Sequence, residues 1–247
     1  MEWRDQGFVL AARRHGESGA IVELLTREHG RHAGLVRGGQ APKLRAVLQP
    51  GNAVAAVWRG RLSDHLGTLV CEMLQPYAAV FLGEPGRLAA LTAATALVAA
   101  ALPEREPFPE VFSSIGNLLE ALESAPDWAA HYVEWEQHLL AALGFGLDLG
   151  RCAVTGMATD LAYVSPRTGR AVSREAGRPY RDNLLPLPAF LWRDAPADRE
   201  QIVLGLALTE HFLVHHVFAP QGRALPPARR RLAERMRCAT AAGTSHE

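Results

Sequence analysis

Hydrophobic and polar positions change their spacing at residue 78. Before it, short apolar runs alternate with glycine-rich turns, and the first two runs flank a turn at residues 15–19 as in a β-hairpin. The predicted strands cover residues 7–11, 21–25, 34–38, 53–58 and 66–70. Five short strands at this spacing predict a small Greek-key barrel such as an OB-fold.

After residue 78, apolar residues recur every three to four positions, which indicates helices. The predicted helices cover residues 88–98, 111–122, 128–142 and 202–218. The turn at residues 144–146 ends the third helix, and the last helix is apolar nearly all round and is therefore predicted to be buried. The predicted fold class is α+β and multidomain: an OB-fold β-barrel at 1–78, then a mainly α-helical domain at 79–247. A zinc-finger-like hairpin at about 150–180 interrupts the helical domain.

Charge is segregated along a chain whose formal net charge is +0. Residues 31–61 contain cations and no Asp or Glu. Residues 81–150, in contrast, contain two arginines and ten acidic residues. The predicted DNA-binding residues are therefore Arg31, Arg37, Lys43, Arg45, Arg59 and Arg61. A basic, acid-free stretch favours a polyanion such as nucleic acid, and a solvated charged face is the alternative.

Arg37, Lys43 and Arg45 are the strongest candidates, because they flank the long connection between the third and fourth predicted strands. Trp58 stands beside two of the other cations, so it either stacks on bases or belongs to the barrel core.

Composition indicates a cytoplasmic protein. The apolar content of 48% is typical of a globular chain, and the charged start at residues 1–5 does not fit a signal peptide. The apolar run at 88–102 is too short to span a bilayer, so no membrane association is expected. Three cysteines far apart do not form a disulfide framework.

The sequence contains no nucleotide-phosphate loop and no Gly-x-Ser-x-Gly elbow. His211 and His215 have the i, i+4 spacing of metal ligands, with His216 beside them, but Phe212 stands where a zinc protease has Glu. Capped or partly exposed histidines are the simpler interpretation. We therefore expect no catalytic residue and no cofactor, so the protein is predicted not to be an enzyme.

A zinc-ribbon spacing begins at Cys152. The four ligand positions would be Cys152, Thr155, Ser173 and Ala176, and one of them is a thiol. One thiolate cannot hold structural zinc. The segment therefore predicts a hairpin with the geometry of a ribbon and no metal.

Together these motifs resemble the RecO family of bacterial DNA repair proteins. The C-terminal part of the resemblance lies in Trp135-Glu136, Leu139-Leu140, Leu143-Gly144-Phe145-Gly146-Leu147-Asp148-Leu149, Cys152 and Gly156. The N-terminal part lies in Gly7-Phe8-Val9-Leu10, Glu17-Ser18, Thr26-Arg27-Glu28-His29-Gly30, Arg37-Gly38 and Leu48-Gln49-Pro50-Gly51. Leu102-Pro103-Glu104 and Pro227-Ala228-Arg229 extend it over nearly the whole chain.

The resemblance implies a recombination mediator of the RecF type, located in the cytoplasm with the nucleoid. Such a protein binds single- and double-stranded DNA, anneals complementary strands, and with RecR helps to replace single-stranded DNA-binding protein by RecA. The chain departs from the family's zinc pattern at three of four positions, so zinc is not carried over. Two alternatives stay open: a protein-interaction adaptor with a purely structural barrel, and a metalloenzyme that uses the helix histidines.

Overall fold

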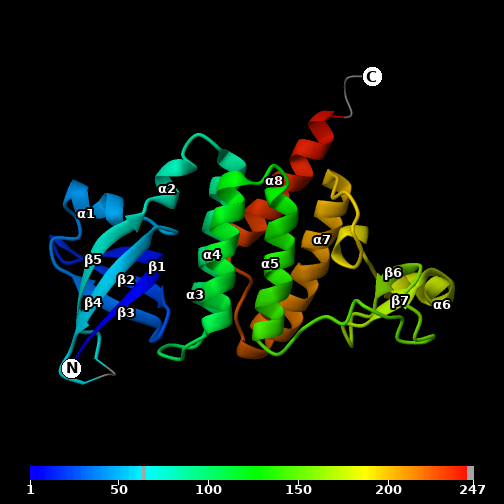
Figure 1. Ribbon diagram of the computed structural model, residues 1–247, viewed down its shortest axis with the longest axis horizontal. Coiled ribbons are helices and arrows are strands. Elements are labelled where there is room, and N and C mark those ends of the chain that lie inside the picture. The colour runs from blue at the N-terminus through cyan, green and yellow to red at the C-terminus, as the bar shows by residue number, and fades with distance from the viewer. Residues whose placement is uncertain (63–64, 244–247) are drawn as a thin grey trace. The chain divides into compact units, whose positions relative to one another are not determined.

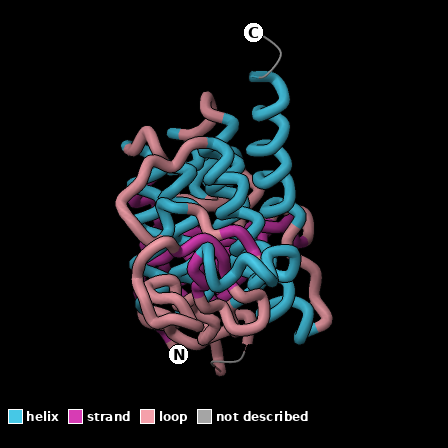
Figure 2. The backbone as a smooth tube through the Cα atoms, turned by 90° about the vertical axis from the view of Figure 1, so that its right-hand side faces the viewer, coloured by secondary structure: helices cyan, strands magenta, loops and turns pink. Residues whose placement is uncertain are grey.

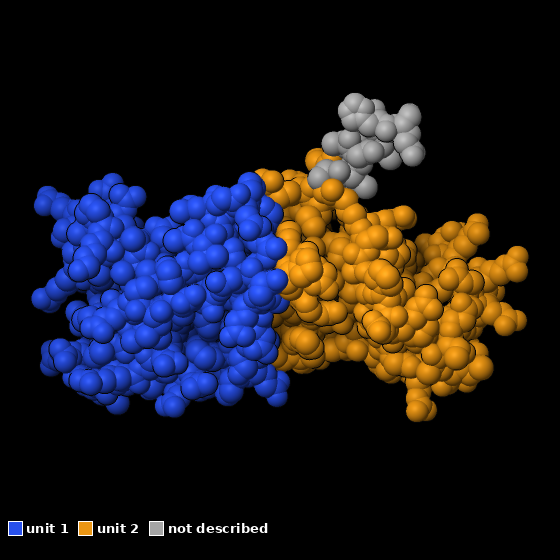
Figure 3. Space-filling view, turned by 45° about the horizontal axis from the view of Figure 1, so that its top comes forward, with its two compact units in different colours: residues 1–124 blue, residues 125–247 orange. Residues whose placement is uncertain are grey.

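A computed structural model describes residues 1–62 and 65–243 of the chain (Figure 1). The chain divides into two compact units, Met1–Ser124 and Ala125–Glu247, coloured blue and orange in Figure 3. The predicted α+β fold class is confirmed, with strands and helices in both units.

A five-stranded barrel forms the first part of unit 1. Its strands are β1 (Glu2–His15), β2 (Gly19–Thr26), β3 (Gly30–Val36), β4 (Ala53–Arg59) and β5 (Thr68–Gln75). They follow the order β1-β2-β3-β5-β4, and β1 closes the barrel by pairing with both β2 and β4. β3 and β5 are parallel and meet at one position, Leu35 with Thr68. This order and the weak β3–β5 junction are those of the partly open OB-fold barrel.

The barrel core comes from the inward-facing residues of its strands. In β2, Val22 and Leu24 are fully buried while Ile21 and Glu23 are partly exposed, which is the alternation a half-buried strand requires. Trp58 is 1% exposed, and its ring N–H donates to the Leu66 carbonyl at 3.0 Å. Trp58 is therefore a core residue and offers no surface for stacking on bases.

The short helix α1 (Pro42–Val47) lies between β3 and β4, and three helices follow the barrel in unit 1: α2 (Tyr77–Val80), α3 (Pro85–Ala101) and α4 (Pro109–Ser124). α3 packs against β1 and β2, and the ring of Phe112 in α4 lies 5.1 Å from that of Phe8 in β1. The boundary between the two compact units therefore falls after residue 124, and α3 and α4 belong to the same unit as the barrel. An independent OB-fold domain at 1–78 stays a prediction.

Unit 2 combines helices with a small three-stranded sheet. Its main elements are α5 (Trp128–Ala142), β6 (Leu161–Val164), β7 (Ala171–Ser173), α6 (Arg174–Gly177), β8 (Leu185–Pro186), α7 (Arg199–Phe212) and α8 (Pro227–Gly243). β6 and β7 form the hairpin predicted for this segment. Gly144, at φ +87°, ends the turn after α5 as predicted.

The helix predicted over residues 202–218 ends where predicted, but the prediction that it is the chain's last helix is wrong. α7 continues as a π-helix over Leu213–Phe218, and α8 follows as a further long helix that leads to the C-terminus (Figure 2). α8 is hard to recognise in the sequence because, apart from Leu232, its buried face carries Ala228, Arg229 and Ala233 rather than large apolar residues.

A fully buried ion pair ties three helices of unit 2 together. The Arg229 guanidinium of α8 donates to the Glu136 carboxylate of α5, and its Nη2 also donates to the Leu206 carbonyl of α7 at 2.8 Å. The Thr209 hydroxyl donates to the same carboxylate. Burial alone would lower the pKa of Arg229, but Glu136 outweighs it and raises that pKa, so the guanidinium stays charged.

The stretch Arg199–Gln221 has the length and the mean hydropathy, 1.5, of a membrane span. Half of its most apolar window is buried inside the protein, because α7 packs against α5 and α8. It is thus the core helix that the sequence predicts.

Candidate nucleic-acid interface

Exposed cations gather at one end of the barrel, where β1 and β3 end and β2 begins. Figure 1 shows the short helix α1 (Pro42–Val47) at this end, opposite the N-terminus. The residues, called here the barrel-end cluster, are Arg13, Arg14, Arg37, Lys43 and Arg45. All five are exposed, and none has a carboxylate within ion-pair distance in the described part of the chain.

Two glycines bring the β3–α1 connection onto the hairpin of β1 and β2. Gly38 has φ +68°, and a Cβ on Gly39 would lie 2.7 Å from the Cβ of Ala20, so a larger residue at position 39 would clash. Gln40 then binds the β1–β2 turn twice: its backbone N–H donates to Ser18 at 3.0 Å and its side-chain amide to Gly19 at 3.1 Å. These contacts place α1 beside the end of β1.

Contacts with the barrel core and with the Asn52 side chain hold α1 in position. Leu48, which follows the helix, is 2% exposed and belongs to the barrel core. The buried Asn52 side chain donates to the carbonyls of Ala46 and Val47 at 2.9 and 3.2 Å, which satisfies the helix end. Its carbonyl oxygen accepts the N–H of Ala78 at 3.0 Å. Lys43 and Arg45 are therefore carried on a fixed helix rather than on a free loop.

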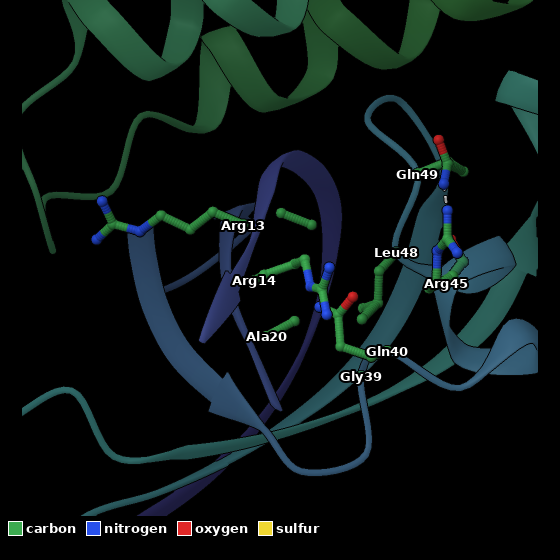
Figure 4. Close-up of a pocket in the computed structure, with 9 residues that line it drawn as sticks. Arg13, Arg14, Ala20, Gly39, Gln40, Arg45, Leu48 and Gln49 are labelled. Atoms are coloured by element: carbon green, nitrogen blue, oxygen red, sulfur yellow. Dashed lines mark hydrogen bonds between the residues drawn. The ribbon is translucent and has the colours of Figure 1, made fainter. Parts of the chain in front are cut away.

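Three residues of the cluster, Arg13, Arg14 and Arg45, line a pocket of about 290 Å³. Its polar lining consists of guanidinium and amide groups, and it contains no carboxylate (Figure 4). The lining residues are Ala12, Arg13, Arg14, Ala20, Gly39, Gln40, Arg45, Leu48 and Gln49. In Figure 4 the Arg13 side chain extends away from those of Arg14 and Arg45, so the cationic surface continues beyond the pocket. Guanidinium forks and amide donors suit phosphate oxygens.

Sequence reasoning missed Arg13 and Arg14. It considered the acid-free window that begins at residue 31, whereas these two arginines precede it and have Glu17 nearby. The signal that was available is a pair of arginines at the end of a predicted strand, directly before the turn of a hairpin.

The other three predicted cations lie at the opposite end of the barrel, so the six do not share one face. Arg59 is bonded to Glu2 of β1 at 2.8 Å. Arg31 is half-buried, pairs with Glu23, and donates to the Leu102 carbonyl at 2.9 Å. Arg61 is exposed two residues after the end of β4.

Three of the four ribbon positions meet around the sulfur of Cys152. This sulfur accepts the backbone N–H of Ser173 at 3.2 Å and that of Thr155 at 3.5 Å, and the Ser173 hydroxyl is 3.5 Å away. Burial raises the pKa of Cys152, but the hydrogen bonds from Ser173 and Thr155 outweigh burial and bring it to about 6. The site holds one thiol, and within residues 1–62 and 65–243 no three His, Cys, Asp or Glu side chains come together as metal ligands.

The histidine rings of α7 and of its π-helical extension contact neighbouring aromatic rings, and two of the histidine rings contact each other. The rings of His211 and His215 are 4.5 Å apart, and His216 stacks on Phe212. Burial first, and then His215, lower the pKa of His211. In the described residues no third ligand joins this pair.

The barrel topology and its cationic end define the class of the protein: an OB-fold protein of the kind that binds nucleic acid. Comparison with known families gives the particular family. Residues 1–77 match the family model "Recombination protein O N terminal", and residues 82–224 match "Recombination protein O C terminal". The chain therefore belongs to the RecO family, and its role lies in DNA repair and recombination.

Curated relatives are similar to the chain over nearly the full length of both sequences. The chain is 54% identical to the DNA repair protein RecO of Rhodospirillum rubrum, over 96% of this chain and 97% of the relative. It is 55% identical to that of Rhodospirillum centenum, over 96% and 95%, and 52% identical to that of Phenylobacterium zucineum, over 96% and 98%.

Proposed function

We propose that the barrel-end cluster binds the sugar–phosphate backbone of single- and double-stranded DNA, and that the protein anneals complementary strands. The observation that carries the proposal is the group of five exposed cations without carboxylate partners in the described barrel, three of which line the pocket. A cation already bonded to a carboxylate has less to gain from a phosphate, whereas these five are free to neutralise one.

This interface would follow the backbone without reading sequence. Its contacts are point charges and guanidinium forks, which recognise phosphates, and Trp58 is not available to stack on bases. Binding should therefore be similar for all sequences and steeply dependent on salt.

The proposed work is not catalytic and needs no cofactor. Annealing requires that two polyanions approach and that their bases pair, and charge neutralisation lowers the repulsion between them. Together with RecR, the protein would displace single-stranded DNA-binding protein and help RecA to load, in the cytoplasm at the nucleoid. The family membership supports this last step.

Annealing of two complementary oligonucleotides without ATP tests the proposal. We expect rapid annealing at low salt that fades as salt rises. The barrel-end variant, which replaces Arg13, Arg14, Lys43 and Arg45 with glutamine, should anneal at least 10-fold more slowly. An opposite-end variant, Arg59→Gln with Arg61→Gln, serves as the control and should anneal at the wild-type rate.

Two results would reject the proposal. One is annealing that depends strictly on ATP. The other is DNA binding that is absent or insensitive to salt in the wild-type protein, which would favour the protein-interaction adaptor with a structural barrel. Unchanged thermal unfolding of the barrel-end variant shows that a loss of annealing is not a loss of fold.

A further inference from the structure

α8 presents a second cationic surface, on unit 2. Four arginines face outward from this helix: Arg230, Arg231, Arg235 and Arg237. At 3.6 residues per turn they fall within one continuous arc of the helix, which we call the α8 arc, and Glu234 is the acidic residue within it. All four arginines are exposed.

The inward face of α8 fixes the direction in which the arc points. Leu232 and Ala233 are buried, and Arg229 is bonded to the buried Glu136 carboxylate. Farther along the helix, the Arg199 guanidinium of α7 donates to the Met236 carbonyl at 3.0 Å. The helix is therefore anchored between Arg229 and Met236, and its apolar face there is already covered.

The α8 arc differs from the ion-paired arginines on the surface of unit 2. Arg170 and Arg174 are also exposed, yet they lie 3.4 and 3.3 Å from Asp148 and Asp160. Within the described residues, none of the four arc arginines has such a carboxylate. Arg231 and Arg235 are like charges at i and i+4, an arrangement that disfavours a helix in isolation. A row of repelling cations on an anchored helix suits an extended anion.

We infer that the α8 arc is a second binding surface for a nucleic-acid backbone, and that it holds the second strand during annealing. Arg230 and Arg237 are separated by about 10 Å along the helix axis. That distance equals the rise of about three phosphates along one strand of B-form DNA. Two strands held on one molecule meet at a raised effective concentration. The inference rests on the proposed function of the barrel-end cluster.

The stoichiometry of a short single-stranded oligonucleotide tests the inference without reference to how the units are arranged. The probe is an octathymidylate, titrated at low salt and followed by calorimetry. The wild-type protein should bind two molecules per chain. The arc variant, with all four arc arginines replaced by glutamine, should bind one, and the barrel-end variant should also bind one.

A control variant matches the arc variant in charge and in unit. It replaces four exposed arginines elsewhere on unit 2 with glutamine: Arg151, Arg170, Arg174 and Arg181. It should bind two oligonucleotides and anneal at the wild-type rate, whereas the arc variant should anneal at least 10-fold more slowly. Equal losses in both variants would mean that overall charge matters and the arc does not.

Cys238 provides a local reporter. It is exposed, adjacent to Arg237 on α8, whereas Cys71 and Cys152 are buried. A fluorophore on Cys238 should respond to octathymidylate in the barrel-end variant and should stop responding in the arc variant.

Several results would overturn the inference. They are one oligonucleotide per wild-type chain, two per arc variant, or a Cys238 signal that requires the barrel-end cluster. Saturation of the arc by a polyglutamate peptide that octathymidylate cannot displace would also overturn it, and would indicate an acidic protein partner. If the barrel-end variant keeps both oligonucleotides while the arc variant loses one, the proposed function fails and the arc stands.

Discussion

Both ends of the barrel carry cations, but these cations differ in exposure and in their partners. At the end that bears α1, Arg14 and Arg45 are exposed around a pocket, with no carboxylate partner in the described chain. At the opposite end, Arg59 is bonded to Glu2, and Arg31 is bonded to Glu23 and to a backbone carbonyl. Charge counts along the sequence therefore do not locate an interface. What distinguishes the ends is that Arg31 and Arg59 already have partners, whereas the cations of the barrel-end cluster have no carboxylate partner in the described chain.

The opposite end is also filled by aromatic rings. Trp3 stacks on His29 at 4.3 Å and on Trp58 at 5.8 Å, and His29 lies 2.8 Å from Asp5. His32 packs edge-on against both tryptophans. Polar groups at this end bond or pack within the protein, so we expect substitutions there to change stability and substitutions in the barrel-end cluster to change binding.

We expect the largest loss of stability when a fully buried, ion-paired cation is replaced. Arg229→Leu leaves the Glu136 carboxylate buried and unpaired, which should lower the free energy of unfolding by about 3–5 kcal/mol. Urea unfolding followed by circular dichroism measures the change. The double variant Glu136→Leu, Arg229→Met is the control and should recover most of the loss. A loss under about 1 kcal/mol in the single variant would contradict the role of paired cations as structural groups.

The next effect is a dependence of stability on pH. Burial first, with Arg105 and His29 adding to it, lowers the pKa of His32 to about 4, and neither ring nitrogen has a hydrogen-bond partner in the described structure. The unfolded chain binds a proton at His32 near pH 6.5 and the folded chain does not. Stability should therefore fall as pH drops from 6.5 to 4, by about 3 kcal/mol from this residue.

Tryptophan fluorescence during urea unfolding at pH 7 and at pH 4 measures this dependence. His32→Phe should remove about 3 kcal/mol of the difference between the two pH values. An equal loss of stability on acidification in wild type and variant would assign the effect to other groups.

A smaller effect is expected at Arg31. Arg31→Gln removes hydrogen bonds to Glu23 and to the Leu102 carbonyl, which should lower the free energy of unfolding by about 1.5 kcal/mol. The affinity for single-stranded DNA and its salt dependence should stay as in wild type. Weaker DNA binding without loss of stability would place Arg31 in the interface and break the distinction between the two ends.

No effect is expected from removal of metal. The Cys152 sulfur already accepts hydrogen bonds from the backbone N–H groups of Ser173 and Thr155. Treatment with a chelator should leave the unfolding temperature unchanged, and elemental analysis should find no zinc. About one zinc per chain, or unfolding on chelation, would refute this. The triple variant Thr155→Cys, Ser173→Cys, Ala176→Cys should acquire zinc, because it restores the four thiols of a ribbon.

Much of the fold was predictable because its elements follow simple periodicities. The barrel strands alternate, and α3, α4 and α5 repeat every three to four residues. α1 was missed because a helix of six residues that begins at a proline carries too little pattern. α8 was missed because one of its buried positions is Arg229, which only the distant Glu136 explains.

The candidate site was predictable in part. The connection that carries Lys43 and Arg45 stood out by composition. The pairing of Arg59 with Glu2 and of Arg31 with Leu102 could not be predicted, because the partners are 57 and 71 residues apart in sequence. Only the closure of the barrel and the packing of α3 bring these groups together.

The salt dependence of single-stranded DNA affinity, measured on two matched double variants, compares the two ends directly. One variant is Arg14→Gln with Arg45→Gln, and the other is Arg59→Gln with Arg61→Gln. The first should weaken binding of all sequences alike and flatten the slope of log affinity against log salt by about 1.4, or 0.7 for each lost phosphate contact. The second should leave the slope as in wild type. Equal slopes in wild type and the first variant, or a flattened slope in the second, would contradict the assignment of DNA binding to the barrel-end cluster.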